Sequence, residues 1–206
     1  EYIQLQGQLH NAIKNQELQL HYQPQIDTNT GKIIGAEALL RWCHPEHGMI
    51  PPGKFIPGAE RSGLIIPIGE WVLNEACHQA QQWRKTHHLP SIVVAVNLSA
   101  LQFKRGNLVE TVMLALEQSG LPAHHLELEL TESILLHDVN DVSNTLLSLK
   151  KMGVRLSIDD FGTGYSSLSY LKQLAVDKLK IDQSFICDMV DDASDAAIVN
   201  AIIQLG

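Results

Sequence analysis

The sequence predicts an α/β protein with a mostly parallel sheet. From residue 91 onward, short apolar runs alternate with longer segments whose apolar residues recur at helical spacing. The links between them are short, as in βαβ units, and both a doubly wound sheet and a β/α barrel fit this alternation. Before residue 91, two strand-like runs flank the turn residues 27–31, which predicts an antiparallel hairpin at the start of the sheet.

The N-terminal part supplies the hairpin and two helices. Pro24 cannot donate a hydrogen bond to a neighbouring strand, so the first strand should lie at an edge. The connection from Trp42 to Gly69 is rich in Pro and Gly and long enough to be functional or to cover a site. The elements expected here are a helix in 1–15, strands at 18–26 and 32–40, a short helix at 52–61 and an amphipathic helix at 68–85.

The remaining elements alternate. Residues 92–96 form a continuous apolar run, β-branched at every position except Ala95, which is typical of a strand covered on both faces. In the strand at 126–130, leucines and glutamates alternate and should face opposite sides. His124 and His125 are expected in an exposed loop. The full expectation is strands at 92–96, 126–130, 155–160 and 177–182, and helices at 106–118, 138–151, 168–174 and from 184 onward.

Composition narrows the possible partners. The chain has 206 residues, 45% of them hydrophobic and 18% charged, which is ordinary for one soluble globular domain. A net charge of −8 argues against binding to duplex nucleic acid or to an anionic membrane. Three widely spaced cysteines indicate reduced thiols and a cytoplasmic setting. Because the chain begins with Glu1 and ends within a helical pattern, we expect residues 1–206 to be excised from a longer protein.

Polar residues recur where the predicted strands end. In a β/α barrel such positions share the C-terminal face, where active sites form. The side chains offer carboxylate and amide oxygens, with no Cys or His among them, and such donors suit Mg²⁺, Mn²⁺ or Ca²⁺. The residues at these ends are Glu37, Asn97, Glu129, Asp159, Asp160 and Lys180.

A purely structural network is the alternative to a metal site. Asp160 could cap the following helix, Asp159 could pair with a basic residue, and Arg41 could pair with Glu37. The carboxylates outnumber the cations Arg41 and Lys180, which favours a metal ion. The natural chemistry is then metal-assisted hydrolysis of a phosphate ester, with Lys180 orienting water and Arg41 clamping a phosphate. The turn 162–164 reads as a mobile loop or, on weaker grounds, as a phosphate cradle.

Seven short motifs, taken together, point to one family. They occur in the order that this family shows and span nearly the whole chain: Tyr22–Pro24, Glu37–Leu39, Phe55–Pro57, Asn97–Ser99, Glu129–Glu132, Asp159–Gly164 and Lys180–Asp182. The chain closely resembles the EAL-domain phosphodiesterases of bacterial cyclic di-GMP signalling. The resemblance implies a TIM-like (β/α) barrel with an antiparallel first strand. Since the family continues into two further strands, the last strands are expected to be missing from this chain.

The resemblance also implies an activity. It implies that one phosphodiester of cyclic di-GMP is hydrolysed to linear pGpG in a reaction that depends on Mg²⁺ or Mn²⁺. It further implies a cytoplasmic location and a homodimer. The full-length protein could be anchored in a membrane through domains outside this chain. A degenerate domain that binds cyclic di-GMP without cleaving it, or that only regulates or dimerises, is the alternative. Such domains typically lose carboxylates of the metal site, and this chain keeps Glu37, Glu129, Asp159 and Asp160, which favours the enzyme.

Individual roles follow from the matched positions. Glu37, Asp160, Lys180 and Glu132 correspond to catalytic residues, Lys180 through contact with the attacking water and Glu132 by fixing the glycine-containing loop near the family's dimer interface. The implied metal ligands are Glu37, Asn97, Glu129, Asp159 and Asp160, and the implied substrate contacts are Gln23, Leu39, Arg41 and Asp182.

Overall fold

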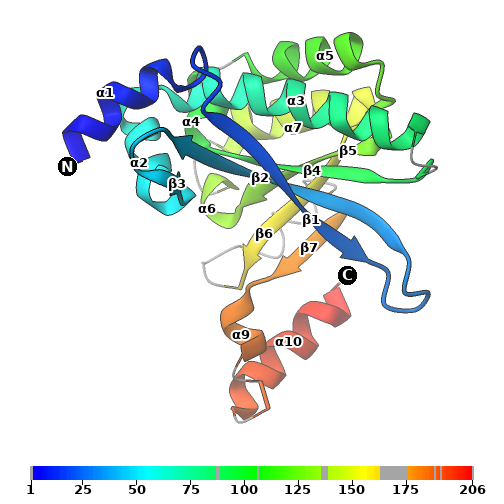
Figure 1. The fold of residues 1–206 in the computed structure, drawn as a ribbon. Coiled ribbons are helices and arrows are strands. Elements are labelled where there is room, and N and C mark those ends of the chain that lie inside the picture. The colour runs from blue at the N-terminus through cyan, green and yellow to red at the C-terminus, as the bar shows by residue number, and fades with distance from the viewer. Residues whose placement is uncertain are drawn as a thin grey trace. The chain divides into compact units, whose positions relative to one another are not determined.

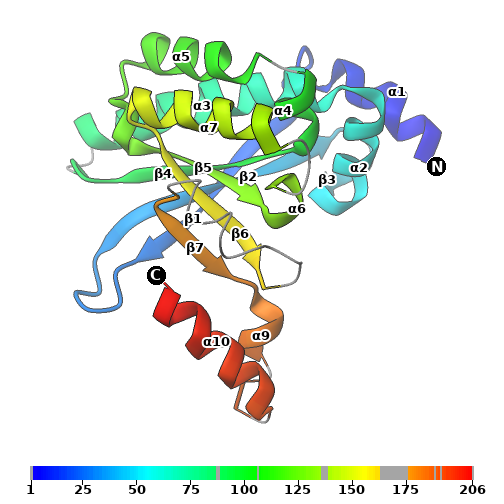
Figure 2. The ribbon, with the colours of Figure 1, turned by 180° about the vertical axis from the view of Figure 1, so that it is seen from behind.

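The computed structural model describes residues 2–86, 89–105, 107–135, 139–162, 176–187, 189–190 and 192–205. The chain divides into two compact units, Glu1–Leu126 and Glu127–Gly206. Each unit combines strands with helices, as Figures 1 and 2 show from opposite sides. The predicted α/β class is therefore confirmed in both units.

The sheet of the first unit begins with the predicted hairpin. Strand β1 (Leu18–Ile26) pairs antiparallel with β2 (Ile33–His44), and Asp27 closes the turn by accepting the backbone N–H groups of Asn29 and Thr30. Strand β4 (Val93–Leu98) pairs parallel with β2, and the short β3 (Gly48–Ile50) pairs with its far end. Since β1 pairs only with β2 in the described sheet, it is an edge strand and tolerates Pro24.

Helices of the first unit pack on this sheet. The long helix α3 (Ile65–Thr86) contacts β4 and lies beside α5 (Leu108–Ser119), as Figure 1 shows. Its buried face carries small and apolar residues, including Leu73, Ala76 and Cys77, and burial raises the pKa of the Cys77 thiol to about 12. The other helical elements of this unit are α1 (Tyr2–Ala12), α2 (Pro52–Ser62), α4 (Ala100–Arg105) and the 3₁₀ turn η1 (Ala123–His125).

The second unit contains three parallel strands. Their order is β5 (Leu126–Thr131), β6 (Arg155–Phe161) and β7 (Lys178–Ile181). The leucines of β5 lie on one face and are fully buried, as the alternation predicts. Helix α7 (Val139–Met152) packs against β6, and α9 (Gln183–Cys187) packs against α10 (Ala193–Leu205). A single helical turn, α6 (Glu132–Leu135), follows β5 directly.

Several sequence-based expectations were wrong in detail. The connection expected at 42–69 is shorter, because β2 continues to His44, β3 follows, and α3 begins at Ile65. The helix expected within it at 52–61 is present as α2. Helices α4 and α6 were not anticipated. His125 is buried rather than exposed, since its Nδ1 lies 2.7 Å from the carbonyl oxygen of Ile92. The helix expected at 168–174 lies outside the described residues.

None of the helices that the structure describes has the length and apolarity needed to cross a lipid bilayer.

Replacing Glu17 with Ala should destabilise the first unit. The indole of Trp42 has no exposed surface, and its Nε1 donates to Glu17 Oε2 at 2.9 Å. A buried donor left without an acceptor costs about 1–3 kcal/mol. Chemical denaturation at pH 7 measures the change in the free energy of unfolding. Glu70→Ala, at an exposed position on α3, is the control and should have little effect.

The stabilisation by Glu17 should also depend on pH. Hydrogen bonds from the Trp42 and Asn15 side chains lower the pKa of Glu17. A carboxylate whose pKa is lowered by folding stabilises the folded state above its unfolded pKa, and this stabilisation is lost as the pH falls through the folded pKa. The difference between the parent and Glu17→Ala should therefore shrink below the ordinary value of 4.5. A difference that stays constant down to pH 3 would contradict this assignment.

Candidate functional site

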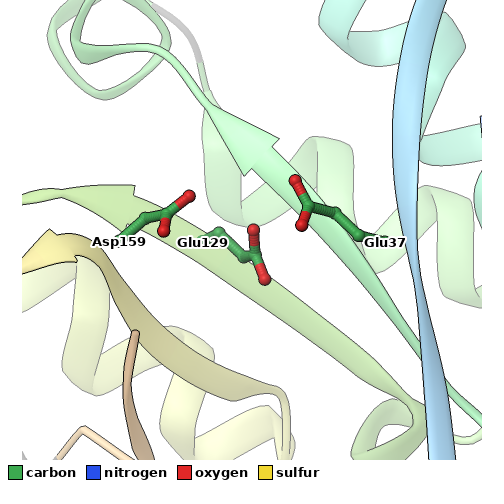
Figure 3. Close-up of side chains that lie close together, drawn as sticks. All are labelled: Glu37, Glu129 and Asp159. Atoms are coloured by element: carbon green, nitrogen blue, oxygen red, sulfur yellow. The ribbon is translucent and has the colours of Figure 1, made fainter. Parts of the chain in front are cut away.

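In the first unit, Glu37 lies in the middle of β2 and faces Asn97. The strand register places Glu37 opposite Gln23 of β1 and opposite Ala95 of β4. Asn97 lies two residues beyond Ala95, so its side chain shares the face of Glu37. Its Nδ2 donates to Glu37 Oε1 at 2.8 Å, which leaves Oδ1 as the amide atom able to act as a ligand. Figure 3 shows the Glu37 carboxylate on β2.

The predicted substrate contacts of β2 extend this face. Leu39 and Arg41 follow Glu37 at intervals of two residues, so all three project from the same side of the strand. Arg41 Nη1 donates to the carbonyl oxygen of Leu40 at 2.9 Å. The structure thus gathers five predicted site residues on one face of the first unit: Gln23, Glu37, Leu39, Arg41 and Asn97.

In the second unit, Lys180 joins two of the predicted metal ligands. Its Nζ lies 2.5 Å from Glu129 Oε2 and 3.0 Å from Asp159 Oδ2. Glu129 and Asp159 point from the neighbouring strands β5 and β6, as Figure 3 shows. The Glu129 side chain has no exposed surface, whereas Lys180 and Asp159 are each 22% exposed. The Lys180 ammonium therefore contacts two carboxylates, one fully buried and one partly exposed.

A bulge explains how two consecutive aspartates belong to one strand end. The pairing of β6 with β7 shifts between Ile158 and Phe161, so one extra residue is inserted at Asp159–Asp160. Asp160 has a φ of 53°, in the left-handed region that Asp tolerates better than most residues. The strand was expected to end at Asp160, but in the structure it continues to Phe161. The bulge interrupts the alternation that would otherwise send these two side chains to opposite faces.

The carboxyl of Asp160 lies in an acidic environment. Burial, the neighbouring Asp159 charge and a hydrogen bond to Asp182 all raise the pKa of Asp160, and Lys180 opposes them. Asp182 itself precedes α9 and accepts hydrogen bonds from the backbone N–H and the hydroxyl of Ser184. These bonds lower the pKa of Asp182. The observed role of Asp182 is to cap α9, and its contact with substrate stays a prediction.

Glu132 contacts the start of the glycine-containing loop. Glu132 is buried at the first position of α6, and its Oε2 accepts the backbone N–H of Gly162 at 3.3 Å. Gly162 has a φ of 105°, and a Cβ at this position would lie 2.9 Å from the ring of Phe185. The residue must therefore be glycine for both conformational and steric reasons. Thr163 and Gly164 lie outside the described residues.

Sequence reasoning missed the neighbours of this cluster. Glu127 is 3% exposed and pairs with Lys178 at 2.6 Å, directly beside the pair of Glu129 and Lys180. Ser157 lies between them on β6 with no exposed surface. The signal was present in the alternation of Glu with Leu in β5 and of Lys with Leu in β7, because it places both glutamates and both lysines on one face.

The donor atoms fit a hard divalent cation. In the second unit, Glu129 and Asp159 offer carboxylate oxygens of the kind that could hold a metal ion, and in the first unit Glu37 offers a carboxylate and Asn97 an amide oxygen. In the second unit Lys180 brings one positive charge beside Glu129 and Asp159, with Asp160 next to them. A divalent cation would add positive charge to this group of carboxylates. Soft metals are disfavoured because no described residue of this group is a Cys or His.

Comparison with known proteins identifies the family. The family model of the EAL domain matches residues 6–206. The chain belongs to the EAL-domain family. The EAL domain is 52% identical over its whole length to the bifunctional diguanylate cyclase/cyclic di-GMP phosphodiesterase MucR of Pseudomonas aeruginosa, of which it spans 30%. It is 43% identical over 203 residues to the cyclic di-GMP phosphodiesterase NbdA of the same organism, spanning 26% of that protein.

A solved structure supports the fold. The structure of the MucR phosphodiesterase in complex with c-di-GMP has a TM-score of 0.94 and 52% identity to the EAL domain, covering 98% of this chain and 82% of that one. This match confirms the predicted TIM-like barrel class with its antiparallel first strand. The strand order is linear within each described unit, so neither unit closes a barrel by itself.

Replacing Asp160 with Asn should stabilise the metal-free EAL domain at pH 7. Asn also tolerates the left-handed backbone, while it removes the charge that repels Asp159 and Asp182. A carboxyl whose pKa is raised by folding destabilises the folded state above that pKa, and this effect vanishes below the unfolded pKa. Thermal unfolding in EDTA should show a higher Tm for Asp160→Asn at pH 7 and no gain below the ordinary value of 3.8.

Glu117→Gln, at an exposed position on α5, is the control for net charge. A gain in Tm of the same size in both variants would show that Asp160 is not in a specifically repulsive site.

Proposed function

We propose that this EAL domain hydrolyses one phosphodiester bond of cyclic di-GMP to give linear pGpG. The observation that carries the proposal is the shared ammonium of Lys180, held between Glu129 and Asp159, in a chain that is 52% identical to the MucR phosphodiesterase. The retained carboxylates Glu37 and Asp160 add support, because a domain that only binds the nucleotide does not need them.

The proposed roles follow from the chemistry of each side chain. The N–H groups of Lys180 lie beside Asp159 Oδ2, where they can orient a water molecule and stabilise negative charge on the attacked phosphate. Arg41 uses one of its five N–H groups on the Leu40 carbonyl oxygen, and the guanidinium can contact a phosphate through others. Gln23, Leu39 and Asp182 are proposed as further substrate contacts, and Glu132 as the residue that holds the loop at Gly162.

The proposed ligands of a divalent cation, Mg²⁺ or Mn²⁺, are Glu37, Asn97, Glu129, Asp159 and Asp160. Such an ion polarises phosphoryl oxygens and lowers the pKa of bound water. In the reaction, the oxygen of one water molecule bonds to phosphorus, the bond from phosphorus to one ribose oxygen breaks, and that oxygen leaves with a proton. The predicted homodimer is part of the proposal, with the loop after Asp160 near its interface.

The direct test is incubation of the protein with cyclic di-GMP and Mg²⁺ or Mn²⁺. We expect pGpG as the product, loss of turnover in EDTA, and recovery when the metal is returned. Binding of cyclic di-GMP without cleavage would overturn the proposal in favour of a receptor. Turnover that is unchanged in EDTA would overturn the metal-dependent mechanism.

Replacing Glu37 with Gln should lower turnover by about 100-fold or more, because one anionic ligand is lost from the proposed metal site. Gln keeps the size of the side chain and can still hydrogen-bond Asn97, so the fold should be retained. Initial rates of pGpG formation measure the effect, and calorimetric titration with Mn²⁺ should show weaker binding. Glu70→Gln on α3 should behave as the parent. Full activity of Glu37→Gln would remove Glu37 from the site.

A further inference from the structure

A second ion pair lies beside the proposed site on the sheet of the second unit. Lys178 Nζ is 2.6 Å from Glu127 Oε1, one pleat away from the contact of Lys180 with Glu129. Glu127 is almost fully buried, whereas the Lys178 side chain is 37% exposed. The two ion pairs are therefore parallel, and each joins a lysine of β7 to a glutamate of β5.

Both lysines must cross β6 to reach their glutamates. Glu129 and Lys178 each lie opposite Ser157 on either side of β6. Neighbouring strands are about 4.8 Å apart, so β5 and β7 are separated by about 10 Å. Ser157 has no exposed surface, and its hydroxyl has no hydrogen-bond partner within the described part of the chain. A small residue is needed at position 157 because the long lysine side chains cross above it. Packing therefore explains the serine better than hydrogen bonding does.

The two ion pairs differ in the number of carboxylates for each lysine. Lys178 contacts the single carboxylate of Glu127, whereas Lys180 contacts those of both Glu129 and Asp159. If Lys178 lost its charge, Glu127 would remain as a buried anion. A buried anion attracts a nearby cation, because burying an unpaired charge is costly. Lys180, two residues along the same strand, is the described cation best placed to respond. Its movement would take it away from Asp159.

We propose that the ion pair of Glu127 and Lys178 positions Lys180, by neutralising the neighbouring buried carboxylate so that the Lys180 ammonium stays on Glu129 and Asp159. The consequence for catalysis rests on the proposed function, whereas the consequence for the geometry of Lys180 does not. Glu127 and Lys178 are positioning residues, since they act through Lys180.

A purely structural ion pair is the alternative, and the same unit offers a matched example. Lys150 pairs with Asp177 at 2.6 Å, with the two side chains 28% and 36% exposed. This pair joins α7 to the residue before β7 and does not lie on the face of Lys180. Loss of an ion pair in general can thus be separated from loss of this particular one.

The first arm of the test is crystallographic and needs no substrate. Structures of the parent, Lys178→Met, Lys178→Arg and Lys150→Met are compared at the Lys180 Nζ. We expect Lys180 to leave Asp159 and approach Glu127 in Lys178→Met, and to keep its parent position in the other two variants. Lys180 still bonded to both Glu129 and Asp159 in Lys178→Met would overturn the proposal.

Glu127→Gln gives a second route if Lys178→Met does not fold. Gln keeps the shape of the side chain, and Lys178 loses its contact with the Glu127 carboxylate. We expect Lys178 to turn toward Glu129 and displace Lys180 from it. A Lys180 ammonium that keeps both of its partners in Glu127→Gln would equally overturn the proposal.

The second arm measures kinetics with cyclic di-GMP at a temperature well below each Tm. We expect kcat to fall by about tenfold or more in Lys178→Met with little change in KM, as is typical when a group that orients an active-site residue is removed. The double variant Glu127→Gln/Lys178→Met, in which neither charge remains, should recover most of kcat, and Lys150→Met should match the parent.

The two arms separate the possible failures. A parent protein that shows no turnover contradicts the proposed function, while the crystal structures still decide the position of Lys180. A kcat that falls equally in Lys178→Met and Lys150→Met, or that follows Tm alone, would overturn the positioning role in favour of a structural one.

Discussion

The sharing of one ammonium between two carboxylates is the interaction on which the proposed site depends. Glu129 is excluded from solvent, so its charge requires a partner, and Lys180 provides it at 2.5 Å. The same ammonium reaches Asp159 at 3.0 Å. One positive charge thus lies between two negative ones, and Asp160 lies next to them. A divalent cation bound at these carboxylates would attract a phosphate diester that the carboxylates alone repel, which links the electrostatics of the site to its proposed chemistry.

The backbone of β6 makes this concentration of charge possible. A regular strand would send Asp159 and Asp160 to opposite faces, but the bulge and the left-handed conformation of Asp160 break the alternation. The cost of that conformation is modest for Asp and would be larger for a β-branched residue. The raised pKa of Asp160 is the electrostatic cost of the same arrangement. Asp160 thus combines an unfavourable backbone conformation with an unfavourable electrostatic environment, as is common at functional sites.

The two units carry different kinds of side chain on their strands. In the first, a hairpin and one parallel strand display mostly neutral groups with Glu37 and Arg41 among them, and the register of β2 with its neighbours aligns them. In the second, three parallel strands carry alternating charges that pair across β6. The face of the second unit's strands that carries these charges is therefore polar and paired, with the small residue Ser157 between the paired side chains.

Sequence patterns by themselves determined the α/β class and the hairpin with its edge strand at Pro24, because period-two and helical spacing are local properties. The expectation that Glu37 marks a strand end was wrong, because β2 continues to His44 and Glu37 lies in its middle. Sequence analysis grouped Glu37 with Asn97 only through the expected barrel, whereas the pairing of β2 with β4 is what aligns their side chains. Only the tertiary structure decided that His125 is buried against Ile92, that Asp182 caps α9, and that Lys178 takes Glu127 while Lys180 takes Glu129. These outcomes depend on which strands become neighbours and on what lies between them, and no local pattern in the chain contains that information.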